Sequence, residues 1–156
     1  MAAANVMQTK DAMSSREGLV FINIEGRTFE IAEILKFKAE VEYNKVEVKR
    51  LNARMEGSKI VGAKGVGEMT MYYHRPEIRA MAMDYLRSGK SPMFDATIIN
   101  ADITSAAGKQ TVDVRNIVPD KTLLAMLDAD SADTLKDEFP FTFDDFEILN
   151  QFNVIQ

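Results

Sequence analysis

The sequence contains no cysteine and only one histidine. The lack of cysteine excludes disulfide bonds and thiolate metal sites, and it is compatible with a reducing compartment. No apolar run approaches the roughly 20 residues that a membrane-spanning helix needs, and the first ten residues lack the apolar region of a signal peptide. We therefore expect no membrane anchoring and no export by the ordinary secretory route.

Motifs for catalysis or metal binding are equally scarce. The histidine, His74, has no recognisable nucleophile motif around it. The glycines between residues 62 and 67 do not follow the order of a phosphate-binding loop. Two groups of acidic turn residues lack the central glycine and final glutamate of a calcium loop: Asp128, Asp130 and Asp133, and Asp144 with Asp145. We predict no enzyme activity, no metal and no cofactor, and interpret these residues as ordinary turn and strand-end positions.

Length and charge indicate one domain that does not hold nucleic acid. A chain of 156 residues, 46% of them hydrophobic, is long enough to bury a core. The net charge of −5 at pH 7 disfavours binding to phosphates. Residues 1–18 are polar, alanine-rich and unpatterned, so we expect an N-terminal arm that is disordered alone and becomes ordered by a partner. Residues 19–156 form the single predicted domain.

The most informative stretch is a long alternation of apolar and polar residues. From Phe29 to Tyr43 the odd positions are mostly apolar and the even positions mostly polar, which predicts a strand with one buried and one solvated face. This stretch is far longer than an ordinary strand of about five or six residues, and such strands usually belong to a sheet that continues into a larger assembly. The alternation slips near Asn44 and Lys45, because Val46 and Val48 occupy even positions, so we predict a bulge there.

A glycine-rich stretch follows, from Arg50 to Gly67. Its glycines and basic residues predict a long loop, after which the chain returns as a strand from Glu68 to His74. One interpretation is that the loop reaches another subunit, since glycine permits tight turns and close backbone approach. The other is a floppy surface loop. The residues assigned to this candidate intersubunit loop are Arg54, Met55, Gly57, Lys59, Gly62, Gly65 and Gly67.

The rest of the chain predicts a mainly β protein with one helix. A helix begins at Pro76 and ends before Gly89, and it presents an apolar stripe made of Ile78, Met81, Ala82, Tyr85 and Leu86. Strands are expected at residues 19–24, 93–103, 110–118, 122–130 and 135–143, with a hairpin turn at 25–26. Strands in runs, rather than alternating with helices, favour an antiparallel β-sandwich or barrel with one flanking helix and a long extended loop.

The C-terminal block is rich in phenylalanine. Phe139, Phe141 and Phe143 share one face of the predicted strand, and the register then shifts to Phe146. This pattern predicts a C-terminal strand that seals a core. Pro140 indicates that the strand lies at a sheet edge or carries a bulge.

Three blocks of residues stand in a characteristic order and spacing. The first is Arg54-Met55-x-Gly57-x-Lys59-x-x-Gly62-Ala63-x-Gly65-x-Gly67, the second is Met83-Asp84-Tyr85 with Gly89, Pro92 and Phe94 after it, and the third is Pro140-Phe141-Thr142-Phe143-Asp144-Asp145-Phe146. With these blocks the chain, over roughly residues 15 to 150, resembles the inner tail-tube proteins of contractile phage tails, the group typified by the defective prophage PBSX of Bacillus.

The resemblance implies two antiparallel sheets with a flanking helix, and rings of six subunits that stack into a hollow tube inside a contractile sheath. The implied partners are other copies of the chain, the sheath protein, and baseplate and terminator proteins. DNA would pass through the bore only in a true phage. The implied location is a virion or a phage-tail-like particle such as an R-type bacteriocin, assembled in the cytoplasm of the bacterial host.

Within such a tube, the polar face of the long strand supplies the candidates for lining the bore: Glu30, Lys36, Lys38, Glu40 and Glu42. The alternative function is a monomeric β-sandwich binding module that uses the glycine-rich residues 50–67 for recognition. Oligomer size distinguishes the two, because a monomeric module has no need of so long a strand.

Overall fold

The computed structural model describes residues 7–14, 16–24, 26–30, 34–72, 76–130 and 134–153. The prediction for His74 concerns a residue outside these ranges. The chain divides into two compact units, one formed by residues 1–33, 93–117 and 145–156 and the other by residues 34–92 and 118–144. Each unit contains an antiparallel sheet, as the sequence predicts.

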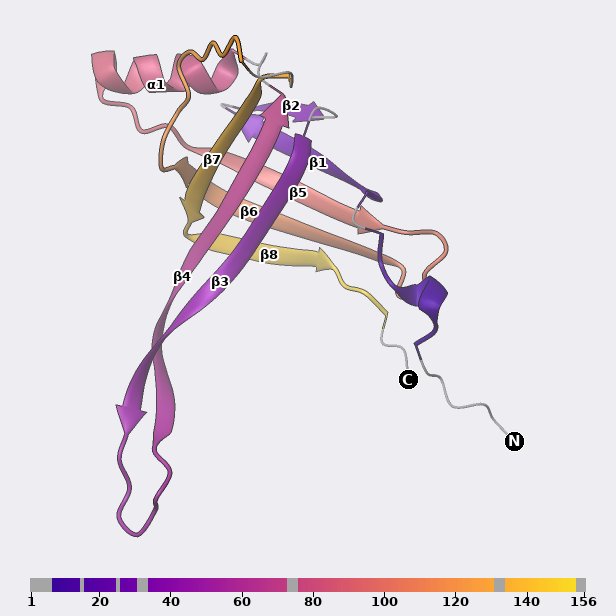
Figure 1. Ribbon diagram of the computed structural model, residues 1–156, viewed down its shortest axis with the longest axis vertical. Helices are drawn as coiled ribbons and strands as arrows, with labels where there is room; N and C mark the ends of the chain where they lie inside the picture. The colour runs from indigo at the N-terminus through magenta and orange to yellow at the C-terminus, as the bar shows by residue number, and fades with distance from the viewer. Residues whose placement is uncertain are drawn as a thin grey trace. The chain divides into compact units, whose positions relative to one another are not determined.

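The sheet of the first unit has the strand order β2-β1-β5-β6-β8 (Figure 1). Its strands are β1 (Gly18–Ile24), β2 (Arg27–Glu30), β5 (Phe94–Ala101), β6 (Lys109–Pro119) and β8 (Asp145–Asn150). Gly26 has a φ of 81° between β1 and β2, which confirms the predicted turn. Ile22, Ala96 and Val114 are buried in the core of this unit.

The second unit has a sheet with the order β3-β4-β7 and the helix α1 (Glu77–Ser88). Its strands are β3 (Ile34–Val48), β4 (Gly57–Tyr72) and β7 (Lys136–Phe143), and the last residues of β6, Val118 and Pro119, pair with the end of β7. The core includes Met69, Met71, Phe139 and Phe141. Phe139, Phe141 and Phe143 are all buried, which confirms the predicted face of that strand.

The helix follows the prediction in its bounds but only partly in its buried stripe. Gly89 ends α1 with a φ of 77°, the left-handed conformation that glycine adopts without strain. Ile78 and Met81 are buried, whereas Tyr85 and Leu86 are exposed. Only the first half of α1 therefore packs into the core of its unit. α1, the one α-helix of the described residues, does not meet the length and apolarity that a bilayer span requires.

The predicted glycine loop is wrong over most of its length. β4 begins at Gly57, so the connection from β3 covers only residues 49–56. Gly65 lies opposite Phe143 and Gly67 opposite Phe141 on the neighbouring strand. A Cβ atom on Gly65 would stand 2.6 Å from the ring of Phe143. These glycines therefore make room for aromatic rings that cover the strand, a packing role that replaces the predicted loop flexibility.

Three further predictions about strands are wrong. The stretch from Phe29 to Tyr43 is not one strand, because Phe29 and Glu30 belong to β2 and pair with β1, whereas β3 begins at Ile34. Residues 122–130 are irregular rather than a strand. The pairing of β6 with β7 ends where Asp120 N donates to the Pro140 oxygen, and Pro140 has no N–H with which to continue a ladder on that edge. Phe146 does not continue β7 but belongs to β8, in the other unit, where it is exposed.

Candidate assembly surface

The β3–β4 hairpin extends past the end of β7 in its unit (Figure 1). β4 pairs with β7 only from Gly65 to Tyr72, so within the described residues its first half has β3 as its sole strand partner. A two-stranded ribbon is at best marginally stable alone in water. This one also exposes large apolar side chains: Tyr43, Val46, Ile60 and Val61. Such a surface is typical of a contact with another protein molecule.

The tip of the hairpin, residues 49–56, is more exposed still. Leu51 is 96% exposed and Met55 is 79% exposed. Asn52 has a φ of 61°, a left-handed conformation that asparagine tolerates in tight turns. The tip also carries Arg54. Of the predicted loop residues, the structure places Arg54 and Met55 at the tip, and Gly57, Lys59, Gly62, Gly65 and Gly67 within β4.

The predicted bulge is confirmed between Asn44 and Lys45, where the register shifts. Asn44 pairs with Gly62 and Lys45 with Ile60, so Val61 is the extra residue and stands on β4. Because β3 continues its alternation through the bulge, Val46 lies on the same strand face as Lys38. The apolar side chains of β3 thus change face along the hairpin, from the buried side to the polar side.

The polar face of this sheet carries balanced charge. Between the bulge and the far end of the sheet, the strand register brings four lysines and four glutamates to that face: Lys36, Lys38, Lys64 and Lys136, and Glu40, Glu42, Glu68 and Glu138. The Lys36 Nζ lies 2.5 Å from Glu68 Oε1. This contact raises the pKa of the Lys36 ammonium and lowers the pKa of the Glu68 carboxyl. Lys38 lies 3.8 Å from Glu40.

The five candidate bore residues do not all lie on one sheet. Lys36, Lys38, Glu40 and Glu42 are successive residues of the polar face of β3. Glu30 is in β2, the edge strand of the other unit. The structure therefore brings four of the five candidates together.

A buried ion pair ties α1 to β7, and no sequence pattern predicts it. Arg79 Nη1 donates to Asp137 Oδ2 at 3.1 Å and to the Leu123 oxygen at 3.2 Å. Asp137 is only 1% exposed, and its Oδ1 has no hydrogen-bond partner among the described residues. Burial raises the pKa of the Asp137 carboxyl, and the nearby Arg79 opposes that rise. Periodicity shows an arginine on a helix and an aspartate on a strand, but not that they meet.

The N-terminal segment is held by two aspartates within its own unit. Asp11 accepts hydrogen bonds from the backbone N–H groups of Gln8 and Ala106. Asp102 accepts one from the backbone N–H of Ser14 and two from Thr104. The predicted arm is thus partly ordered by its own chain, through residues 7–14, rather than by a partner alone.

We expect acid to release this segment. The hydrogen bonds lower the pKa of both carboxyls. The main cause at Asp11 is its backbone N–H donors, and the main cause at Asp102 is the Thr104 hydroxyl. A carboxyl whose pKa is lower in the folded chain than in the unfolded chain stabilises the fold at pH values above its unfolded pKa, about 4. This stabilisation is lost as the pH falls through the folded pKa. Hydrogen exchange of residues 7–14 is expected to lose protection as the pH falls below about 4, the ordinary value of an aspartate carboxyl.

The substitution Asp102→Ala should produce the same loss at pH 7, because it removes the acceptor for Ser14. Asp120→Ala, a change at an exposed aspartate, serves as the matched control and should leave the protection intact. Unchanged protection of residues 7–14 in Asp102→Ala would show that the carboxylate does not hold the segment.

Comparisons with known proteins place the chain in a family. The family model described as "Phage tail tube protein" matches residues 5–150. The uncharacterized protein YqbM of Bacillus subtilis (strain 168) is 35% identical over 145 residues, which cover 93% of this chain and 95% of YqbM. The phage-like element PBSX protein XkdM of the same strain is 35% identical over 142 residues, covering 91% and 93% of the two chains.

Solved structures share the fold at low sequence identity. A chain of the sheath–tube complex of PVC, an extracellular contractile injection system, matches with a TM-score of 0.63 and 14% identity, covering 90% of this chain and 93% of that one. A chain of the anti-feeding prophage baseplate matches with a TM-score of 0.63 and 15% identity, covering 88% and 95%. These likenesses show the tail-tube fold that the resemblance implies.

The family model matches nearly the whole length of the chain, and two relatives are more than one third identical to it. These findings decide the class of protein. The chain belongs to the phage tail tube protein family, and it is a structural tail-tube subunit of a phage-tail-like particle rather than an enzyme.

Proposed function

We propose that copies of this chain close into rings of six, and that the rings stack into a hollow tube that a surrounding sheath drives through a target envelope. The observation that supports this best is the half-unsupported β3–β4 hairpin with its exposed apolar side chains. A monomer leaves these side chains in water, whereas a neighbouring copy removes them from it.

Open strand edges support ring closure. Within the described residues β2 and β8 each pair on one side only, and so does the long β3. Exposed edges of this kind promote pairing with other chains unless they are covered. Pairing of such edges around a closed ring leaves no edge free, as in a β-barrel.

We assign the polar face of β3 to the bore. That face is polar and therefore suits the wall of a water-filled bore, and the charges of its lysines and glutamates compensate one another. In a true phage, DNA would pass along this wall, and in a bacteriocin-like particle the bore would remain free of DNA. The further partners are the sheath, the baseplate and a terminator, and assembly takes place in the cytoplasm of the bacterial host.

Shortening the hairpin tests the proposal. A variant that lacks residues 46–59 and joins Lys45 to Ile60 through Asn-Gly keeps every strand pair between Glu42 and Ile34 and supplies a favoured two-residue turn. We expect it to fold with the thermal stability of the full chain and to form no tubes by electron microscopy. The substitution Glu47→Gln, in the same hairpin, is the control and should leave assembly unchanged.

Two outcomes would contradict the proposal. Normal tubes from the shortened variant would show that the hairpin is not an assembly element. A full-length chain that stays monomeric even with its baseplate partners would favour the monomeric binding module.

A further inference from the structure

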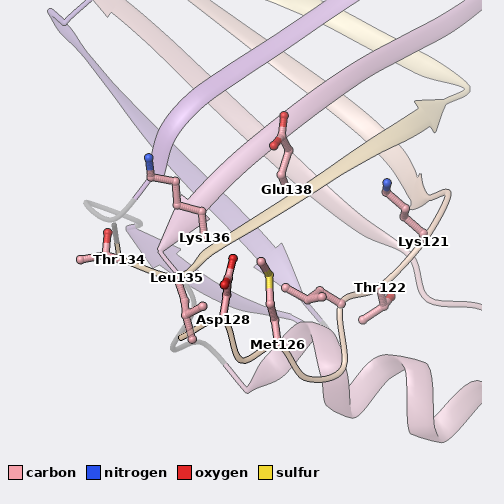
Figure 2. Close-up of a pocket in the computed structure, with 9 residues that line it drawn as sticks. Lys121, Thr122, Met126, Asp128, Thr134, Leu135, Lys136 and Glu138 are labelled. Atoms are coloured by element: carbon pink, nitrogen blue, oxygen red, sulfur yellow. The ribbon is translucent and has the colours of Figure 1, made fainter. Parts of the chain in front are cut away.

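A groove of about 460 Å³ lies beside β7, between this strand and the segment that follows β6 (Figure 2). Its apolar lining comes from Leu123, Met126 and Leu135. Its charged lining contains both signs: Lys121 and Lys136, and Asp128 and Glu138. Figure 2 shows the side chains of Met126 and Asp128 extending from the segment toward β7. A groove that combines apolar and charged lining can receive a segment of the same mixed character.

The groove exists because the sheet stops short on this side of β7. Only Phe141 and Thr142 of β7 pair with β6. Asp120 N then donates to the Pro140 oxygen, and the missing N–H of Pro140 prevents further pairing. From Lys136 to Phe139, β7 has β4 as its sole strand partner in the described part of the chain. The irregular segment 121–128 fills the place of a further strand without closing the gap.

The hairpin tip is complementary to the groove in its chemistry. It exposes Leu51 and Met55, two large apolar side chains, and a site of about 300 to 1,000 Å³ has room for both. The tip also carries charged residues of both signs, the basic Lys49, Arg50 and Arg54 and the acidic Glu56. These can pair with Asp128 or Glu138 and with Lys121 or Lys136.

Tip and groove lie at opposite ends of the same strand. The tip precedes Gly57, the first residue of β4, and the groove lies beside Lys136, which pairs with Tyr72, the last residue of β4. The 16 residues of β4 span about 50 Å at roughly 3.3 Å per residue, so a tip cannot reach the groove of its own chain. Complementary patches at opposite ends make a head-to-tail contact, which continues from copy to copy instead of closing a dimer.

We propose that the groove between β7 and residues 121–128 receives the hairpin tip of a second copy of this chain, with Leu51 and Met55 against Met126 and Leu135. This contact links successive copies head to tail along the direction of β4. The inference rests on the proposed tube and adds the receiving surface to it.

Cysteine cross-linking tests the assignment, because the natural chain contains no cysteine. The double variant Met55→Cys with Met126→Cys is assembled into tubes, oxidised, and also treated with a short bis-maleimide. We expect a ladder of covalent oligomers on a denaturing gel, since every copy carries both halves of the contact. A second pair, Leu51→Cys with Met126→Cys, gives the same expectation through another tip residue.

Controls separate this inference from the proposed tube. Each single-cysteine variant, and the pair Met55→Cys with Leu86→Cys on the exposed part of α1, should give no ladder. Tubes that form but give no ladder with either tip–groove pair would overturn the groove assignment and leave the tube intact. A ladder equally strong in the α1 control would overturn it as well. Failure of the wild-type chain to form tubes would overturn the tube itself.

Discussion

Replacing Gly67 by alanine is expected to destabilise the second unit by about 3 kcal/mol, the upper end of the cost of overpacking a core. The new methyl group would overlap the backbone oxygen of Lys38, and it would stand 2.5 Å from the ring of Phe141. Because Gly67 is paired on both sides, with Ala39 and Phe141, the strand cannot shift to relieve one overlap without worsening the other.

Gly62→Ala provides a control in the same strand. A Cβ atom there meets only the side-chain nitrogen of Asn44, at 3.5 Å, which is an ordinary contact. Alanine also restricts the unfolded chain more than glycine, so the change should be neutral or stabilising by about 0.5 kcal/mol. Urea unfolding of the two variants beside the natural chain measures the difference. Equal stability of both variants would show that the packing of Phe141 on Gly67 is not a tight constraint.

Replacing Arg79 by methionine is expected to cost about 3 kcal/mol at pH 7, because breaking a buried ion pair leaves the other charge without compensation. Asp137 is buried and already has one oxygen without a hydrogen-bond partner in the described residues. Removing the guanidinium leaves the carboxylate with no opposite charge to offset its loss of hydration. Methionine retains much of the arginine stem, so the loss reflects charge more than packing.

The destabilisation by Arg79→Met should shrink as the pH falls. Burial raises the pKa of Asp137, and loss of Arg79 removes the group that opposes the rise. The penalty is therefore full at pH values above the raised pKa and disappears as the carboxyl takes up a proton. The difference in free energy of unfolding between the natural and variant chains, taken from pH 4 to pH 8, measures this penalty. The substitution Asp137→Asn should abolish most of the effect of Arg79→Met, and a penalty independent of pH would refute the charge explanation.

Sequence periodicity was sufficient for the features that depend on neighbouring residues. The alternation before Tyr43 predicted the long β3, although not its start, and Gly89 predicted the end of α1. The slip at Asn44 predicted the position of the bulge, but the extra residue, Val61, is on β4. Each of these depends on local geometry, namely strand alternation, register and positive φ. The mainly β fold followed from the same patterns.

The errors come from contacts between residues far apart in the sequence. Gly65 and Gly67 favour a loop by composition, yet the rings of Phe143 and Phe141 occupy the space beside them. Residues 122–130 read as a strand, but Pro140 ends the ladder that would have paired with them. The Arg79–Asp137 pair joins residues that are 58 positions apart. No local pattern predicts such pairings, because they depend on which strands lie side by side.

The central claim, that the chain assembles into a tube, is tested most directly by electron microscopy of the purified protein, with sizing chromatography in parallel. We expect rings with a central hole and six-fold symmetry, stacked into tubes when baseplate partners are added. A chain that remains a monomer in the presence of those partners, with its hairpin tip still freely accessible to solvent, would contradict it.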